Sequence, residues 1–173
     1  ILEVGIGTGR IGVPLLERGA NLIGCDLSIE MMRTLCNKYP AARLTRSDAA
    51  RLPFPADRFD VLITIHVLHL VGAWRTALRD FKRVLKSTGV YINSWHWHDQ
   101  NSIDHKARQY WRDRIEARGF TWRRPGIQSR EELFAELKAM GAHVEEKEIA
   151  RGVDQAKPRE ILDGLTDRVF SDT

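Results

Sequence analysis

Three glycines near the start of the chain, Gly5, Gly7 and Gly9, have the spacing of a ligand-binding turn. They follow an apolar run and precede a second apolar-periodic segment that begins at Ile11. A strand that enters a glycine-rich turn and then a helix exposes main-chain N–H groups, because glycine has no side chain to keep a ligand away. Glu3 stands out within the apolar run, since burying a carboxylate costs free energy unless a cation or a hydrogen-bond donor meets it. The pattern therefore predicts a ligand site.

The same glycines also fit a dinucleotide-binding pattern. Residues 7–12 satisfy G-x-G-x-x-G, and Asp26 follows at a suitable distance for the acid that binds a ribose in that pattern. On the glycines alone, an NAD(P)-dependent oxidoreductase is an open alternative. Glu3 and the motifs further along the chain are needed to decide which cofactor the turn binds.

Four stretches resemble class I S-adenosylmethionine-dependent methyltransferases. The opening apolar-apolar-Glu-apolar-Gly-x-Gly-x-Gly run resembles motif I of that family. GCDLSIEMM resembles its G-x-D-x-S-x-x-M signature, and Ser47-Asp48-Ala49 resembles its short Asp-Ala signature. LPFPADRFDVLITIHVLHLV resembles the fourth-strand region of small-molecule methyltransferases, and a dehydrogenase gives no reason to expect it. The resemblance is specific over about residues 1–95 and only architectural beyond them.

The resemblance implies S-adenosyl-L-methionine as the cofactor. It implies that Glu3 lies near the cationic amino-acid end of the cofactor, that the glycines line the same end, and that Asp26 accepts hydrogen bonds from both ribose hydroxyls. Asp48 would accept from the adenine amino group, and the N–H of Ala49 would reach a ring nitrogen. The residues expected to bind the cofactor are Glu3, Gly5, Gly7, Gly9, Asp26, Leu27, Met31, Asp48, Ala49 and His66.

Some of these residues also have simpler interpretations. Leu27 and Met31 commonly flank the adenine in the family, but core packing explains Met31 equally well. Asp48 on its own fits an ordinary surface turn, and only its place after the predicted third strand favours the adenine contact. Their assignment therefore depends on the neighbouring motifs.

The reaction that the resemblance implies needs few catalytic groups. A sulfonium is an activated methyl donor, so in-line displacement depends on positioning more than on a metal or a covalent nucleophile. An acceptor hydroxyl or ring nitrogen would benefit from a base. His66, expected beside the reacting methyl, and His69, one helical turn further, are the candidates, with a structural histidine as an equal alternative for each. Trp95 at the end of the predicted fifth strand and His96 directly after it are expected to face the substrate, with plain packing as the alternative, and no catalytic residue is assigned.

Neither a metal nor a nucleic acid is the expected partner. His96, His98, Asp99 and His105 match no metal-binding spacing. The basic run at 106–130 could hold RNA, but a helix with a solvated charged face explains it better. The Asn-Pro-Pro-Tyr signature of base-methylating enzymes is missing after the fourth predicted strand. A small-molecule acceptor is therefore expected, and a non-catalytic nucleotide- or RNA-binding module is the second alternative.

These residues need a particular order of elements to come together, and apolar periodicity, caps and glycines predict that order. Strands are expected at about residues 1–6, 21–26, 42–47, 59–65, 90–95 and 143–149. Helices are expected at about residues 10–18, 28–39, 74–85 with Gly89 closing the end, 103–115, 129–140 and 158–168. Asp26, Asp48 and His66 then follow the carboxyl ends of strands, the edge at which open α/β sheets bind ligands.

The expected fold is α/β, with a Rossmann-like, doubly wound, mostly parallel sheet and helices on both faces. Residues 1–173 are expected to form a single methyltransferase domain, with an inserted, lid-like helical segment at about 99–128. The sequence offers no seventh strand, and it starts inside a core strand without a methionine. We therefore expect a fragment that lacks the seventh strand and the N-terminal helix of the family.

The composition is that of an ordinary globular protein. The 173 residues are 43% hydrophobic and carry a formal net charge of +4. No apolar run approaches the roughly 20 residues of a membrane-spanning helix, so no membrane partner is expected. Cys25 and Cys36 are expected to be reduced core thiols of a cytoplasmic protein. The sequence does not predict the oligomeric state, the acceptor or the atom that is methylated.

Overall fold

The computed structural model describes residues 1–94, 102–121 and 124–149. Among these, residues 1–94 and 124–144 form one compact unit, and residues 102–121 and 145–149 belong to a second one. Among the described residues of the second unit, 103–116 form the helix α4 (Ile103–Glu116), which lies within the segment expected as an insertion. The single-domain organisation itself stays a prediction. Trp95, His96 and the helix expected at 158–168 lie outside the described residues.

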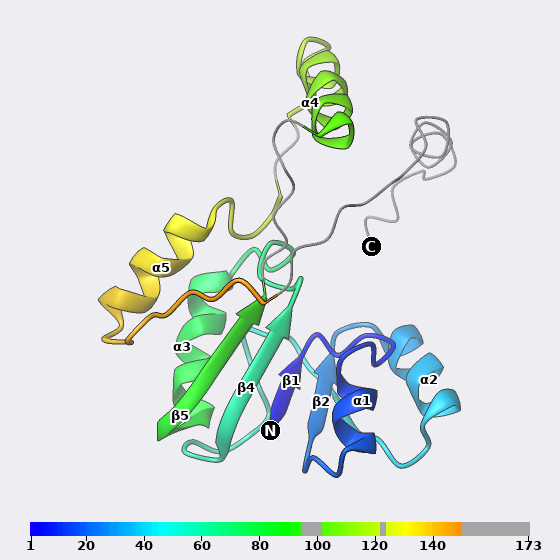
Figure 1. Ribbon diagram of the computed structural model, residues 1–173, viewed down its shortest axis with the longest axis vertical. Coiled ribbons are helices and arrows are strands. Elements are labelled where there is room, and N and C mark those ends of the chain that lie inside the picture. Colours follow the sequence, from blue (N-terminus) through cyan, green and yellow to red (C-terminus); the bar gives the residue numbers. More distant parts are fainter. Residues whose placement is uncertain (95–101, 122–123, 150–173) are drawn as a thin grey trace. The chain divides into compact units, whose positions relative to one another are not determined.

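The first unit contains a parallel sheet of five strands in the order β3-β2-β1-β4-β5 (Figure 1). The strands are β1 (Leu2–Val4), β2 (Ile23–Asp26), β3 (Arg43–Arg46), β4 (Phe59–Ile65) and β5 (Leu85–Ser94). β1 pairs with both β2 and β4, so that Glu3 has Gly24 on one side and Ile63 on the other. The strand order reverses beside β1, and such a reversal is where doubly wound sheets bind ligands. The predicted Rossmann-like fold class is confirmed.

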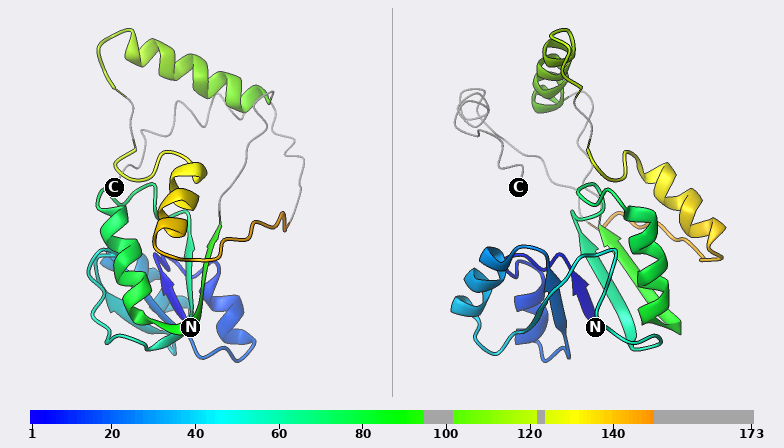
Figure 2. Two further views of the ribbon diagram at one scale, coloured as in Figure 1. Left: turned by 90° about the vertical axis from the view of Figure 1, so that its left-hand side faces the viewer. Right: turned by 180° about the vertical axis from the view of Figure 1, so that it is seen from behind.

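Helices cover both faces of this sheet, as predicted. They are α1 (Gly12–Glu17), α2 (Ile29–Lys38), α3 (Trp74–Val84) and α5 (Arg130–Ala139). Figures 1 and 2 show α1 and α2 on one side of the strands and α3 with α5 on the other. Because side chains alternate along a strand, Leu2 and Val4 of β1 pack in the core of the α3 side, whereas Glu3 points to the side of α1.

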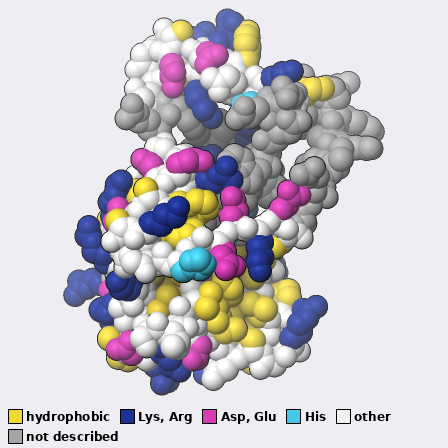
Figure 3. All heavy atoms as spheres, turned by 60° about the vertical axis from the view of Figure 1, so that its left-hand side comes forward, with side chains coloured by type: hydrophobic (Ala, Val, Ile, Leu, Met, Phe, Trp, Pro, Cys, Tyr) yellow, Lys and Arg dark blue, Asp and Glu magenta, His cyan; other side chains and the backbone are white. Residues whose placement is uncertain are grey.

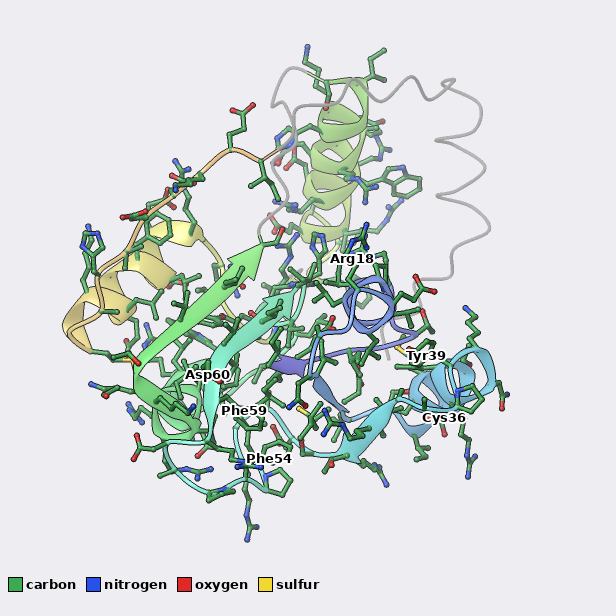
Figure 4. All side chains as sticks on the ribbon, turned by 60° about the horizontal axis from the view of Figure 1, so that its bottom comes forward. Arg18, Cys36, Tyr39, Phe54, Phe59 and Asp60 are labelled. Carbon is green, nitrogen blue, oxygen red and sulfur yellow. The ribbon has the colours of Figure 1, made fainter. Side chains whose placement is uncertain are left out.

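Each face has its own hydrophobic core. On the α3 side, the predicted stripe of Trp74, Ala77, Leu78, Phe81 and Val84 is buried. Residues from α5 and the segment before it join this core. On the α1 side the core is smaller, and its fully buried members are Ile6, Leu22 and Leu35. Phe54 and Phe59 make an edge-to-face contact with ring centroids 5.1 Å apart (Figure 4).

The predicted end of the third long helix was wrong. Gly89 does not close it, because the helix ends at Val84 and Leu85 already pairs with Phe59 as the first residue of β5. The register then passes from Phe59 opposite Leu85 to Val61 opposite Val90, so residues 86–89 form an irregularity within β5. The apolar residue Leu85 fits the helical stripe, but its side chain belongs to the sheet core. Periodicity alone could not separate these two roles.

Two further expectations were wrong. Residues 143–149 form no strand, and Ile149 is 89% exposed, so their alternation of apolar and polar residues does not place them in the sheet. Cys36 is not a core thiol, because its side chain lies on the exposed side of α2 (Figure 4), whereas Cys25 in β2 is buried and both are free. The spacing around Cys36 predicted the helix, but it did not determine whether Cys36 lies on the buried or the exposed face of that helix.

On the side of α1, part of β5 is exposed in the described structure. Val90 and Ile92 of β5 keep about half of their surface exposed, at 53% and 46%. Figure 3 shows exposed hydrophobic side chains gathered below a band of charged ones. Within the described part of the chain, no helix is both long and apolar enough to cross a membrane.

Candidate functional site

The glycine turn adopts a backbone that side chains would obstruct. Gly5, Gly7 and Gly9 all have positive φ angles, of 75°, 55° and 84°. A Cβ atom on Gly5 would overlap the side chain of Val67, and one on Gly9 would lie 2.5 Å from Cδ1 of Leu35. The turn therefore requires glycine both for its conformation and for the close approach of neighbouring elements.

Asp26 fixes this turn from the end of the neighbouring strand. Its Oδ2 accepts a hydrogen bond of 2.8 Å from the N–H of Gly7, and its Oδ1 accepts one of 2.9 Å from the N–H of Ser28. Each carboxylate oxygen can accept more than one hydrogen bond, so both can still receive a hydroxyl. The predicted ribose acceptor thus lies directly beside the glycine turn, although its role in binding stays a prediction.

Glu3 is buried and incompletely paired. Its side chain is 2% exposed, and its Oε2 has no hydrogen-bond partner among the described residues. Burial raises the pKa of Glu3 to about 7, and the positive charge of Arg10 opposes that rise. Oε2 lies against the start of α1, where a Cβ atom on Gly12 would come within 2.7 Å of it. Gly12 therefore makes room for the carboxyl group.

Leu27 and Met31 lie at the surface beside the turn. Leu27 is 62% exposed and Met31 is 48% exposed, which excludes core packing as the explanation of Met31. The sulfur of Met31 lies 3.6 Å from the position that a Cβ atom on Gly7 would take. Two exposed apolar side chains next to a polar turn could flank a flat ring, and their contact with adenine stays a prediction.

Asp48 and Ala49 follow the carboxyl end of β3. Ser47 N–H donates to the carbonyl of Asp26 with a distance of 3.0 Å, which joins this segment to the end of β2. Asp48 is exposed, and its Oδ1 accepts a hydrogen bond of 2.8 Å from the N–H of Ala50. The side chain of Ala49 is buried. The structure thus places Asp48 in a turn at the predicted edge, and its contact with adenine stays a prediction.

A histidine-bearing loop follows β4 and contacts the glycine turn. His66 has a positive φ of 57°, which is uncommon for a residue with a side chain. Its neighbour Val67 is the residue that packs on Gly5. The rings of His66 and His69 meet edge to face, with centroids 6.5 Å apart. The structure therefore brings both histidines to the carboxyl edge beside the predicted cofactor turn.

The segment before α5 holds this loop, a contact that the sequence did not predict. Gly126 N–H donates to the His69 carbonyl at 3.0 Å, and Ile127 N–H donates to the Leu68 carbonyl at 3.1 Å. A Cβ atom on Gly126 would overlap the Leu68 carbonyl oxygen. Partial burial lowers the pKa of His69, and the charges of Arg124 and His66 lower it further. The Pro125-Gly126 pair was the only local signal of a close backbone approach.

The described residues contain no cluster of three or more His, Cys, Asp or Glu side chains that could hold a metal ion. His96, His98 and Asp99 lie outside them. Glu3 lies on β1, Asp26 ends β2, and Asp48 lies in the turn that follows β3. His66 and His69 follow a fourth strand.

Comparison with known sequences identifies a family. A sequence profile described as a methyltransferase domain matches residues 2–93, more than half of the chain. Demethylmenaquinone methyltransferase of Streptomyces avermitilis is 36% identical over 92 residues, which cover 53% of this chain and 40% of that protein. Phosphatidylethanolamine N-methyltransferase of Cereibacter sphaeroides is 30% identical over 98 residues, with coverage of 53% and 48%. The chain thus spans less than half the length of these two curated relatives.

Solved structures agree with the fold. An S-adenosylmethionine-dependent methyltransferase from Mesorhizobium loti has a TM-score of 0.50 and 26% identity, over 53% of this chain and 44% of that chain. The YcgJ protein of Bacillus subtilis has a TM-score of 0.61 and 24% identity, over 80% and 59%. These matches favour the methyltransferase interpretation of the glycine turn over the nicotinamide-dependent one. The chain therefore belongs to the methyltransferase domain family, whose cofactor is S-adenosyl-L-methionine.

Proposed function

We propose that this protein transfers the methyl group of S-adenosylmethionine to a small organic acceptor. The observation that carries the proposal is the pairing of Asp26 with the glycine turn, through the 2.8 Å bond from Gly7 N–H to Oδ2. This pairing holds a carboxylate, which can accept hydrogen bonds from hydroxyl groups, beside the main chain of the turn. A ligand with a ribose and a charged end fits such a combination, and the family membership supports S-adenosylmethionine as that ligand.

We assign the remaining residues to the two ends of the cofactor. Glu3, beneath the turn, would face the amino-acid end, and the exposed Leu27 and Met31 would enclose the adenine. Asp48 is accessible at the end of β3 to accept from the adenine amino group. The methyl group would then lie toward the loop after β4, because that loop packs on the glycine turn through Val67.

The acceptor would approach from the loop that carries His66 and His69. Transfer from a sulfonium is an in-line displacement, so the protein contributes mainly by holding the acceptor atom on the line of the breaking bond. His69 is suited to accept a proton from an acceptor hydroxyl or ring nitrogen, because its lowered pKa favours the neutral imidazole. The names of the two relatives, for a quinone and a phospholipid, support an organic acceptor in place of nucleic acid.

A methyl-transfer assay tests the proposal directly. The chain would be incubated with S-adenosylmethionine labelled in the methyl group and with separate acceptors: a demethylated naphthoquinone, phosphatidylethanolamine vesicles, simple phenols and amines, and RNA. We expect label in one class of small organic acceptor and none in RNA. Label in RNA alone would overturn the small-molecule proposal. Cofactor binding without label in any acceptor would favour a non-catalytic module.

A further inference from the structure

The buried carboxyl group of Glu3 has a further consequence for ligand binding. Among the described residues, the buried polar side chains are those of Glu3 and Thr64. The hydroxyl of Thr64 makes hydrogen bonds with the hydroxyl of Tyr91 at 2.7 Å and with Oδ1 of Asn93 at 2.9 Å. Glu3 differs, because its Oε2 makes no hydrogen bond within that part of the chain. An ionised carboxylate at such a site lacks the water and the donors that would stabilise its charge.

The surroundings of Glu3 offer little compensation for a negative charge. On its own strand and on β4 the neighbours are apolar, with Ile63 directly opposite. β2 contributes Gly24 opposite and the thiol of Cys25, whose own pKa is raised mainly by burial and slightly by Glu3. α1 presents Gly12, which has no side chain. Arg10 in the turn is the one cation that acts on Glu3 in the described structure, and it is exposed.

We infer that the binding of S-adenosylmethionine at the glycine turn releases a proton from Glu3 to the solvent. The inference depends on the proposed function, which brings the ammonium group of the cofactor to this turn. In the ligand-free protein the proton neutralises a buried group, and an arriving cation takes over that task. The O–H bond of the carboxylic acid breaks, its proton passes to the buffer, and the carboxylate then pairs with the ammonium group.

The linkage has a defined size and sign. In the ligand-free chain, burial raises the pKa of Glu3 to about 7. If the bound cation brings the pKa below ~5, binding at pH 7 releases about half a proton, and affinity rises about tenfold from pH 6 to pH 8. The affinity rises with pH because the ligand binds the chain in which Glu3 is ionised, and at low pH part of the binding free energy is spent on removing the proton from Glu3.

The test is calorimetric titration of the chain at pH 7 in two buffers of different ionisation enthalpy, which counts protons released on binding. S-adenosylhomocysteine is the first probe, because it keeps the ammonium group and lacks the transferable methyl. 5′-Methylthioadenosine is the second, because it lacks the amino-acid end. We expect about half a proton for the first probe and close to none for the second. This comparison needs no variant, so it does not depend on how a substitution folds.

Two variants locate the proton. Glu3→Gln should abolish the release with S-adenosylhomocysteine, whereas Glu17→Gln, an exposed substitution on α1, should retain it. Equal release with both probes, or unchanged release in Glu3→Gln, would overturn the inference while leaving the proposed cofactor intact. A folded chain that binds neither probe would overturn the proposed function and the inference together.

Discussion

At the scale of single residues, the site depends on two carboxyl groups in opposite surroundings. Asp26 has both oxygens engaged by main-chain N–H groups, so it is a fixed acceptor. Glu3 lies deeper, with one oxygen unpaired within the described structure and a pKa of about 7. Family motifs predicted both acids, but the protonation of Glu3 follows from burial that only the folded chain shows.

Glu3→Gln should stabilise the ligand-free chain, and the gain should grow from pH 5 to pH 8. Burial raises the pKa of Glu3 above its unfolded value, so the folded state holds its proton more tightly than the unfolded state. The contribution of Glu3 to the free energy of unfolding is therefore fully present below the unfolded pKa of about 4.3. It is lost as the pH rises through the folded pKa near 7. At pH 8 the free energy of unfolding of Glu3→Gln should exceed that of the wild type by about 3 kcal/mol.

Urea denaturation at several pH values measures this gain, with Glu17→Gln as the matched variant on the exposed side of α1. A difference that does not change between pH 5 and pH 8 would contradict the assigned cause. A loss of stability at every pH would mean that the carboxyl group makes a hydrogen bond that the glutamine cannot replace.

Arg124→Gln should raise the pKa of His69. Burial is the largest cause of the lowered pKa of His69, and the positive charge of Arg124 is the second. Removing the charge of Arg124 therefore stabilises the protonated imidazolium. NMR titration of the His69 ring protons measures the change, and Arg33→Gln on α2 serves as the control. An unchanged or lowered pKa in Arg124→Gln would show that Arg124 does not act on this histidine.

At the scale of elements, the glycine turn is the point at which β1, α2 and the loop after β4 meet. Gly5 receives Val67 from that loop, and Gly9 receives Leu35 from α2. The glycine pattern predicted a turn that a ligand approaches, but in this structure two of the three glycines also admit neighbouring side chains. Gly126 has a comparable role toward the histidine loop, because it lies against the Leu68 carbonyl.

Gly9→Ala should destabilise the chain more than Gly19→Ala. Both glycines have φ angles above 80°, so both substitutions introduce backbone strain of about 1 kcal/mol. Only the Cβ atom on Gly9 meets a neighbour, with Cδ1 of Leu35 at 2.5 Å, whereas the one on Gly19 meets nothing within 4 Å. We expect a total loss of about 2–4 kcal/mol for Gly9→Ala. Thermal unfolding compares the two variants, and equal losses would contradict the packing role of Gly9.

At the scale of the whole molecule, the sequence predicted a mostly parallel sheet, and five of its six expected strands are present in the structure. Those predictions depended on local signals, such as the cap at Ser28, whose side chain accepts from Met31 N–H at 3.3 Å. What the sequence did not predict needs long-range contacts. Leu85 fits a helix until β4 provides Phe59 as its partner, and residues 143–149 alternate without entering the sheet.

In the candidate site too, the features that depend on local sequence could be predicted, and those that depend on long-range contacts could not. Asp26 and the glycines could be located from motifs, because a turn between a strand and a helix is a local structure. The exposure of Met31 and the hydrogen bonds from Gly126 and Ile127 to the histidine loop could not, since they depend on elements far apart in the sequence. The protonation of Glu3 also depends on such packing.

The most direct test of the account is calorimetric titration of S-adenosylmethionine and of NAD into separate samples of the chain. We predict that S-adenosylmethionine binds and that NAD does not. Asp26→Asn should lose the binding, because the amide cannot accept from Gly7, Ser28 and two hydroxyls as the carboxylate does. The exposed Asp57→Asn is the matched control and should bind like the wild type. Binding of NAD in place of S-adenosylmethionine, or of neither by a folded sample, would contradict the account.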